Sequence, residues 1–143
     1  MITLDTRDFD ADIRRFAEQL ELGPGIVARK IALDIFGDLL AGTPVDTGRA
    51  RSNWRISIRT PDLTVLETVG ESAASAAIQY SIAQARLFRF NGRQPIYITN
   101  PLPYIEPLNE GWSQQAPAGF VQAAILRNVR PVITAREFLG RGQ

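Results

Sequence analysis

The stretch Gly42-Thr43-Pro44-Val45-Asp46-Thr47-Gly48-Arg49 limits the possible folds more than any other part of the chain. Glycine, proline and side chains such as Asp46 and Thr47, which can hydrogen-bond their own backbone, are typical of a fixed turn. The residues before it have the pattern of a helix, and the residues after it have the pattern of a strand. The turn therefore sets how the first part of the chain meets a sheet.

Apolar residues at helical spacing predict two helices before this turn. Residues 6–21 form an amphipathic pattern, with Thr6 or Asp8 as the capping residue. Residues 25–41 carry a wider apolar stripe that ends at Gly42 as the C-terminal cap. This stripe is wide enough to cover a sheet.

Further helical segments are predicted after the turn. Residues 73–87 are rich in alanine, which favours helix but buries little area, so this helix must lie close against another element. A short helical turn is expected around residues 103–109. A long helix should begin at Pro117, and Pro131 should kink it or separate a short helix over 131–139, because the proline ring clashes with the preceding turn.

Strand patterns lie between the helices. Residues 53–59 alternate between apolar and polar side chains, the period of a half-buried strand, and their polar face presents Arg55 and Arg59. Residues 63–69 are predicted as the hairpin partner of this strand, and residues 94–99 as a third strand. The predicted class is α+β, a small antiparallel sheet of three to four strands packed by N-terminal and C-terminal helices. A chain of 143 residues is expected to be a single domain, with its last four residues frayed.

The chain contains neither cysteine nor histidine, which excludes thiol catalysis, histidine acid–base chemistry, zinc-finger sites and disulfide bonds. Asp46 beside Thr47 lacks a nearby base that could activate the hydroxyl group. Glu106 and Glu110 would share a helix face, but no catalytic setting surrounds them. Glycine motifs for phosphates or dinucleotides are missing. The sequence therefore predicts a protein that is not an enzyme, with no catalytic residue, cofactor or metal ion.

Residues 1–5 lack the basic region and apolar core of a signal peptide. No apolar run approaches the roughly 18 residues of a membrane span. We therefore expect synthesis in a cytoplasm and no membrane association.

Charge is unevenly distributed along the chain, although the formal net charge is only +1. Residues 1–46 hold nine acidic and five basic residues, a net charge of −4, whereas residues 47–93 hold seven basic and three acidic residues, a net charge of +4. Copies of such a chain can stack through opposite charges, or the charges can form a solvated surface. The arginines that could pair with acidic residues of a neighbour or face DNA are Arg49, Arg51, Arg55 and Arg59.

Three groups of residues occur in order between residues 43 and 120. They are Thr43-Pro44-Val45-Asp46-Thr47-Gly48-Arg49 followed by Asn53-Trp54, then Tyr97-Ile98-Thr99-Asn100 with Leu102-Pro103-Tyr104-Ile105-Glu106, then Gly111-Trp112-Ser113 with Gln115-Ala116-Pro117-Ala118-Gly119. Together these motifs resemble the neck or tail-completion proteins of long-tailed bacteriophages, a family similar in role to the minor tail protein Z of phage lambda.

This resemblance implies a structural virion protein at the capsid–tail junction, at the head-proximal end of the tail. Such proteins form rings around the DNA channel, most often with six-fold symmetry, and help to join tail to capsid. The implied partners are further copies of the chain, adjacent head-closure, tail-terminator and tail-tube proteins, and packaged DNA without sequence specificity. The candidate contact residues are Pro44, Asp46, Thr47, Arg49, Asn100, Leu102, Pro103, Tyr104, Glu106, Trp112 and Pro117.

The alternative interpretation is a small nucleic-acid-binding or regulatory domain that works alone. Tyr97 or Phe90 could stack on a base beside the arginines. Such a domain would be a monomer whose DNA affinity falls with salt.

Overall fold

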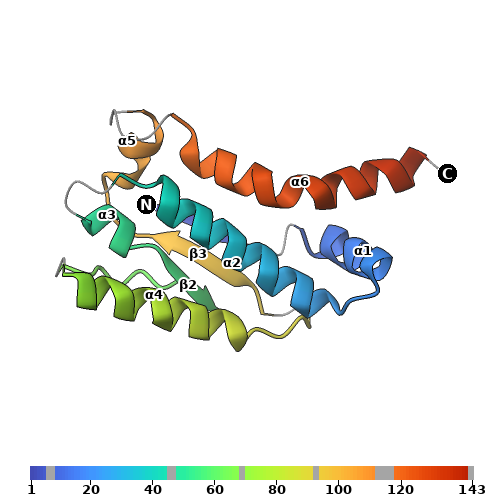
Figure 1. The fold of residues 1–143 in the computed structure, drawn as a ribbon, viewed down its shortest axis with the longest axis horizontal. Helices are drawn as coiled ribbons and strands as arrows, with labels where there is room; N and C mark the ends of the chain where they lie inside the picture. Colours follow the sequence, from blue (N-terminus) through green and yellow to red (C-terminus); the bar gives the residue numbers. More distant parts are fainter. Residues whose placement is uncertain (6–8, 45–47, 68–69, 92–93, 112–117, 142–143) are drawn as a thin grey trace.

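A computed structural model describes residues 1–5, 9–44, 48–67, 70–91, 94–111 and 118–141. Within these ranges the chain forms three strands and six helices, which confirms the predicted α+β class with a small antiparallel sheet (Figure 1). The elements in chain order are β1 (Ile2–Asp5), α1 (Asp10–Leu20), α2 (Pro24–Gly42), α3 (Arg49–Ser52), β2 (Arg55–Ile58), α4 (Glu71–Arg86), β3 (Ile96–Asn100), α5 (Ile105–Asn109) and α6 (Phe120–Arg141).

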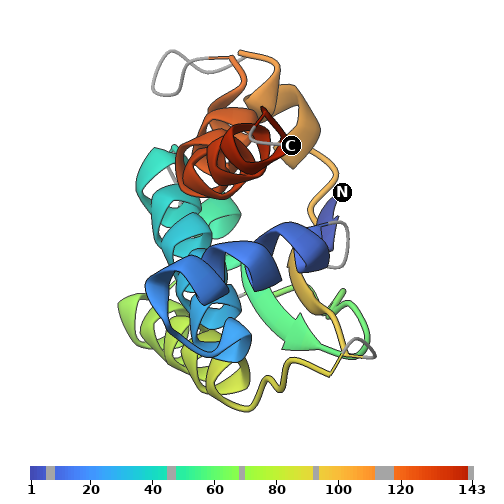
Figure 2. The same cartoon turned by 90° about the vertical axis from the view of Figure 1, so that its right-hand side faces the viewer.

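The sheet has the order β1-β3-β2, and β3 pairs antiparallel with both neighbours. Ile98 of β3 lies between Leu4 of β1 and Ile56 of β2, and this apolar row faces the helices. The adjoining row, centred on Thr99, faces the opposite side because side chains alternate along a strand. Figure 2 shows the helices gathered on one side of the sheet.

Helix α2 lies at the centre of the packing and contacts α1, α4 and α6. Its residues Phe36 and Leu39 are buried, and they meet buried Trp54 and Ile56 in one continuous hydrophobic core. The wide apolar stripe predicted for this helix is explained by this position, because the helix is covered on several sides. Helix α6 packs along α2 and α1 (Figure 1).

The predicted second strand over residues 63–69 is wrong within the described residues. Strand β2 pairs with β3, and the chain from 60 to 67, which we call the strap, forms no β-ladder. The side chain of Asn53 pairs with the strap in place of a strand. Its Nδ2 donates to the Leu66 carbonyl at 3.0 Å, and its Oδ1 accepts from the Leu66 N–H at 2.7 Å.

The strand predicted over residues 53–59 forms as β2, but it is not half-buried, because the strap covers its polar face. Ser57 Oγ donates to the Thr60 carbonyl at 2.8 Å and accepts from the Asp62 N–H at 3.0 Å. Thr99 Oγ1 donates to the Asp62 carbonyl at 2.7 Å. Arg55, predicted to be presented on this face, is only 6% exposed. Polar side chains replace backbone pairing here, and alternation alone does not reveal it.

Two short elements were not predicted. Strand β1 adds a third member to the sheet, and its Ile2 and Leu4 pack partly buried against the core. Helix α3 has only four residues and follows Gly48, whose φ of 72° lies in the left-handed region that favours glycine. Both elements are too short to give a clear periodic pattern.

The predicted helices over 25–41, 73–87 and 103–109 correspond to α2, α4 and α5. Helix α1 begins at Asp10, and the expected caps Thr6 and Asp8 lie outside the described residues. Helix α6 continues through Pro131 as one helix, so the separate helix predicted over 131–139 does not form. In the described part of the chain no helix is long and apolar enough to span a membrane.

The start of α6 lies next to the end of α5. The Gly119 N–H donates to the Asn109 carbonyl at 2.6 Å, and Asn109 Oδ1 accepts from the Val121 N–H at 2.9 Å. Gly111 has a φ of 94°, and a β-carbon at this position would come within 3.1 Å of the Ala118 side chain. These contacts fix residues 111 and 118 next to each other.

Helix α4 covers the outer edge of β2, where backbone groups would otherwise be unpaired. Ser81 Oγ accepts from the Ile56 N–H at 3.1 Å, and Ser81 is fully buried. Ala85, also fully buried, lets the helix come close to the core. The small side chains of α4 therefore serve close approach, as its alanine-rich sequence predicted.

Replacing Ser81 by alanine should leave the Ile56 N–H buried without an acceptor. We expect the free energy of unfolding to fall by about 1–3 kcal/mol, the cost of an unpaired buried polar group. Urea denaturation measures this change. Ser75→Ala, on the exposed side of the same helix, is the control and should change stability little. Equal effects of the two substitutions would contradict the role of Ser81.

Candidate functional site

The two proline-containing segments that carry the resemblance meet at one end of the molecule. Helix α3, which directly follows Gly48, and helix α5, which directly follows residues 100–104, lie at the same end in Figure 1. They are far apart in sequence, since Ala50 and Asn100 are separated by 50 positions. The contacts between them define the candidate site, which we call the turn–loop surface: Arg49 and its partners Glu67 and Tyr104, with exposed Pro103 and Glu106.

Asn100 joins the two segments. It is the last residue of β3 and is fully buried. Its Nδ2 donates to the Ala50 carbonyl at 2.9 Å, and its Oδ1 accepts from the Leu102 N–H at 3.2 Å. One amide side chain therefore positions α3 and the start of the proline-rich loop together.

Arg49 connects three parts of the turn–loop surface. Its Nη2 lies 3.0 Å from Glu67 Oε2 of the strap, and its guanidinium carbon lies 5.8 Å from the centre of the Tyr104 ring. Partial burial raises the pKa of Tyr104, an effect that the Arg49 charge opposes and the Glu67 charge reinforces. The phenol therefore keeps its proton at neutral pH and can donate a hydrogen bond.

The surface rests on a buried hydrogen-bond chain below it. Trp54 Nε1 donates to Thr43 Oγ1 at 2.8 Å, and Thr43 Oγ1 donates to the Leu39 carbonyl at 2.6 Å. Trp54 is 1% exposed, so its indole N–H needs this partner. These two hydrogen bonds tie the end of α2 to the start of β2 and fix where the segment between them begins.

Some of the contact residues predicted from sequence are buried, and others are exposed. Pro44, Asn100 and Leu102 are buried within the chain, so their side chains hold the shape of the site. Pro103 and Glu106 are exposed, and Glu106 Oε1 lies 3.1 Å from the Met1 ammonium group. The predicted residues Asp46, Thr47, Trp112 and Pro117 lie outside the described residues.

The four arginines proposed to pair with a neighbour or face DNA do not share one environment. Arg51 and Arg59 are exposed, whereas Arg49 is half-buried and paired. Arg55 is buried, and its Nη1 donates to the Ser52 carbonyl at 2.7 Å. Burial lowers the pKa of Arg55, and the charge of Asp62 partly offsets this effect. The Arg55 guanidinium group therefore interacts with Ser52 and Asp62 of its own chain.

Sequence reasoning did not identify Glu67 as the partner of Arg49. The two residues are 18 positions apart, and the strap brings them together only because Asn53 holds Leu66. An acidic residue after a basic strand is a weak signal by itself. Recognising that Asn53 can act as a pairing partner for backbone would have been needed to place it.

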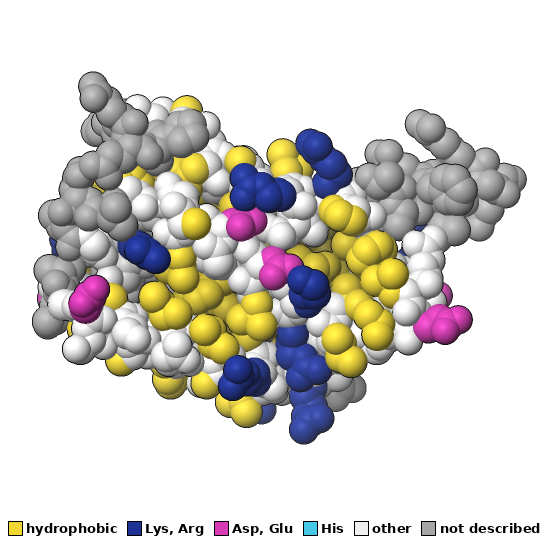
Figure 3. All heavy atoms as spheres, viewed as in Figure 1, with side chains coloured by type: hydrophobic (Ala, Val, Ile, Leu, Met, Phe, Trp, Pro, Cys, Tyr) yellow, Lys and Arg dark blue, Asp and Glu magenta, His cyan; other side chains and the backbone are white. Residues whose placement is uncertain are grey.

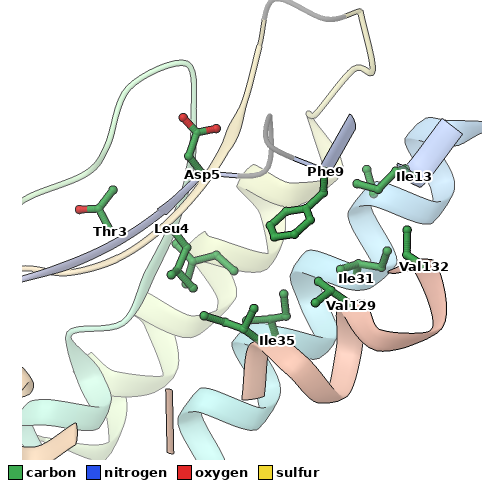
Figure 4. Close-up of a pocket in the computed structure, with 12 residues that line it drawn as sticks. Thr3, Leu4, Asp5, Phe9, Ile13, Ile31, Ile35, Val129 and Val132 are labelled. Carbon is green, nitrogen blue, oxygen red and sulfur yellow. The ribbon is translucent and has the colours of Figure 1, made fainter. Parts of the chain in front are cut away.

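An apolar cavity of about 250 Å³ lies between β1, α1, α2 and α6 (Figure 4). Leu4, Phe9, Ile31 and Val129 are among its lining residues. Thr3 and Asp5 border it, but Figure 4 shows their side chains on the other side of β1 from that of Leu4. The cavity therefore offers space without reactive groups.

The described residues include no group of three or more acidic, histidine or cysteine side chains that could hold a metal ion. Comparison of the chain with protein-family models, curated proteins and solved structures found no match.

Replacing Asn100 by alanine should separate the two segments. It leaves the buried Leu102 N–H without its acceptor, at a cost of about 1–3 kcal/mol, and removes one of the two hydrogen bonds to the Ala50 carbonyl, which keeps the Asn53 N–H. Chemical denaturation should show the loss. Gln79→Ala, an amide removed from the exposed side of α4, is the matched control. A stability loss no larger than that of the control would show that Asn100 does not hold the site.

Replacing Val129 by isoleucine should fill part of the apolar cavity. One added methylene in apolar surroundings is worth about 0.8 kcal/mol, so the free energy of unfolding should rise by up to that amount. Val121→Ile is the control, because Val121 is buried on the same helix and is not a lining residue of the cavity. Thermal denaturation should show stabilisation by the first substitution and none by the second.

Proposed function

We propose that the chain is a structural virion protein of the neck or tail-completion type, placed at the head-proximal end of a phage tail. It forms a ring, most simply a hexamer, that helps to join tail to capsid around the DNA channel. It works by contact with its neighbours and not by catalysis. Its neighbours are further copies of the chain and the adjacent head-closure, tail-terminator and tail-tube proteins.

One observation carries this proposal. The motifs at 43–49 and 100–106, which the resemblance had marked independently, come together through Asn100 and through the Arg49–Tyr104 contact. Residues that act in one interface must lie on one surface. The buried Asn100 holds the two segments together from inside, and the exposed Pro103 restricts the backbone at the surface, so the surface has a fixed shape.

The chemistry of the turn–loop surface suits protein contacts. Aromatic and arginine side chains are enriched at the energetic centres of interfaces. Arg49 and Tyr104 are held in place before any partner arrives, by Glu67 and by each other. Preorganisation of this kind lowers the entropy lost on binding.

The location of the chain tests this proposal directly. Cryo-EM of the capsid–tail junction in purified particles should show the chain as a ring at the head-proximal end of the tail. Absence of the chain from the particles would overturn the structural assignment. The alternative, a nucleic-acid-binding or regulatory domain that works alone, would then become the leading interpretation.

Replacing Tyr104 by alanine tests the assigned contact surface. Truncation of an aromatic residue at the centre of an interface costs about 2 kcal/mol or more, so the number of completed particles in an infection assay should fall at least tenfold. Tyr80→Ala is the matched control, because Tyr80 is 57% exposed on α4, away from this surface. Because Tyr104 packs partly against the core, its variant should lose some stability, and denaturation of both purified variants should confirm that each is folded at the temperature of the assay. Normal particle numbers with Tyr104→Ala would show that the contact surface lies elsewhere.

A further inference from the structure

A second charged surface lies where α1, α2 and the end of α4 meet. Phe90 is at its centre. The Arg14 guanidinium carbon lies 5.3 Å from the centre of the Phe90 ring, and a β-carbon on Gly25 would lie 3.5 Å from the Phe90 β-carbon. Arg29 Nε donates to the Gly25 carbonyl at 3.2 Å. We call Arg14, Arg29, Arg86 and Arg89 the basic end; the last two lie at the end of α4 and beside Phe90.

These four arginines have no acidic partner in the part of the chain that the structure describes. Arg14, Arg86 and Arg89 are exposed, and Figure 3 shows dark-blue side chains gathered below the end of α4. By contrast, Lys30 is paired with Asp34 at 2.7 Å, and Arg127 with Asp38 at 3.1 Å. The arginines of the basic end are therefore not neutralised by an ion pair within the described residues.

Acidic residues near the basic end lie on α1, where Asp10 and Glu18 stand four positions before and after Arg14. The first turn of α2, which begins beside Phe90, contains no acidic residue. Arg86 lies in the last turn of α4, where it also complements the negative end of the helix dipole. That single role does not account for Arg14, Arg29 or Arg89, which lie outside α4.

We infer that the basic end binds the phosphate backbone of double-stranded DNA, without reading its sequence. The guanidinium group matches phosphate oxygens with paired hydrogen bonds. The four groups come from separate elements along one end of the molecule, an arrangement that suits an extended polyanion carrying about one charge per 1.7 Å of its axis. The inference deepens the proposed function by naming the surface that faces DNA, and it rests on that function for its biological setting.

This assignment differs from the expectation based on the strand arginines. Arg55 is buried and Arg49 is paired with Glu67, so neither is free to contact phosphate. The basic end instead combines Arg86 and Arg89 from the basic part of the sequence with Arg14 and Arg29 from its acidic part. Folding brings them to one place.

Fluorescence anisotropy with a labelled duplex of about 20 base pairs and the full chain tests the inference. Wild-type protein should bind, with an affinity that falls as salt rises. Because each phosphate contact adds about one to the slope of log affinity against log salt, the double variant Arg86→Ala/Arg89→Ala should lower this slope by about two. Its affinity at low salt should fall about tenfold or more.

Two controls separate this role from a general loss of charge. Arg127→Ala/Arg130→Ala removes the same charge from two exposed positions on α6, away from the basic end, and should leave the slope unchanged. Arg86→Lys/Arg89→Lys keeps the charge and should keep most of the slope. Absence of wild-type binding, equal effects of the two alanine variants, or a lysine variant as weak as its alanine counterpart would each overturn the inference.

The particle experiment separates failure of this inference from failure of the proposed function. A ring at the capsid–tail junction together with no DNA binding by the basic end would remove the inference alone. DNA binding that depends on Arg86 and Arg89 in a chain absent from particles would remove the proposed setting and support the DNA contact itself.

Discussion

The hydrogen-bonding groups of strand β2 must all be satisfied, and much of the structure follows from this constraint. One edge pairs with β3, and the other receives Ser81 from α4. The polar face is covered by the strap through Asn53 and Ser57. Because an unpaired buried polar group costs as much as several favourable contacts gain, these side chains determine where α4 and the strap can lie. The turn–loop surface is then built on the elements that they position.

Long periodic elements were predictable from sequence, and short or side-chain-dependent ones were not. The stripe of α2 and the alanines of α4 each repeat over several turns, so helical spacing identified both. Strand β1 and helix α3 have four residues each, too few for a period to be distinguished from chance. The strap has the composition of a strand, but Asn53 replaces its ladder partner, which depends on distances that no local pattern contains.

In both charged surfaces, residues that are far apart in the sequence contact each other in ways that the sequence pattern did not predict. Arg49 and Tyr104 were both expected at a contact surface, but their pairing and the part played by Glu67 depend on the path of the strap. The division of the sequence into an acidic segment (residues 1–46) and a basic segment (residues 47–93) did not predict which arginines lie together. Arg14 and Arg29, from the acidic part, join Arg89 around Phe90 because α1 and α2 turn back at that end.

The contact of Gly111 with Ala118 and the bond from Gly119 to Asn109 close the chain at the base of the intervening segment. Because Asn109 bonds to Gly119 and Val121, the end of α5 and the start of α6 are held together directly, whatever the length of the segment between residues 111 and 118. Doubling the length of a closed loop costs only about 0.6 kcal/mol in entropy. An insertion between residues 111 and 118 is therefore expected to cost little stability.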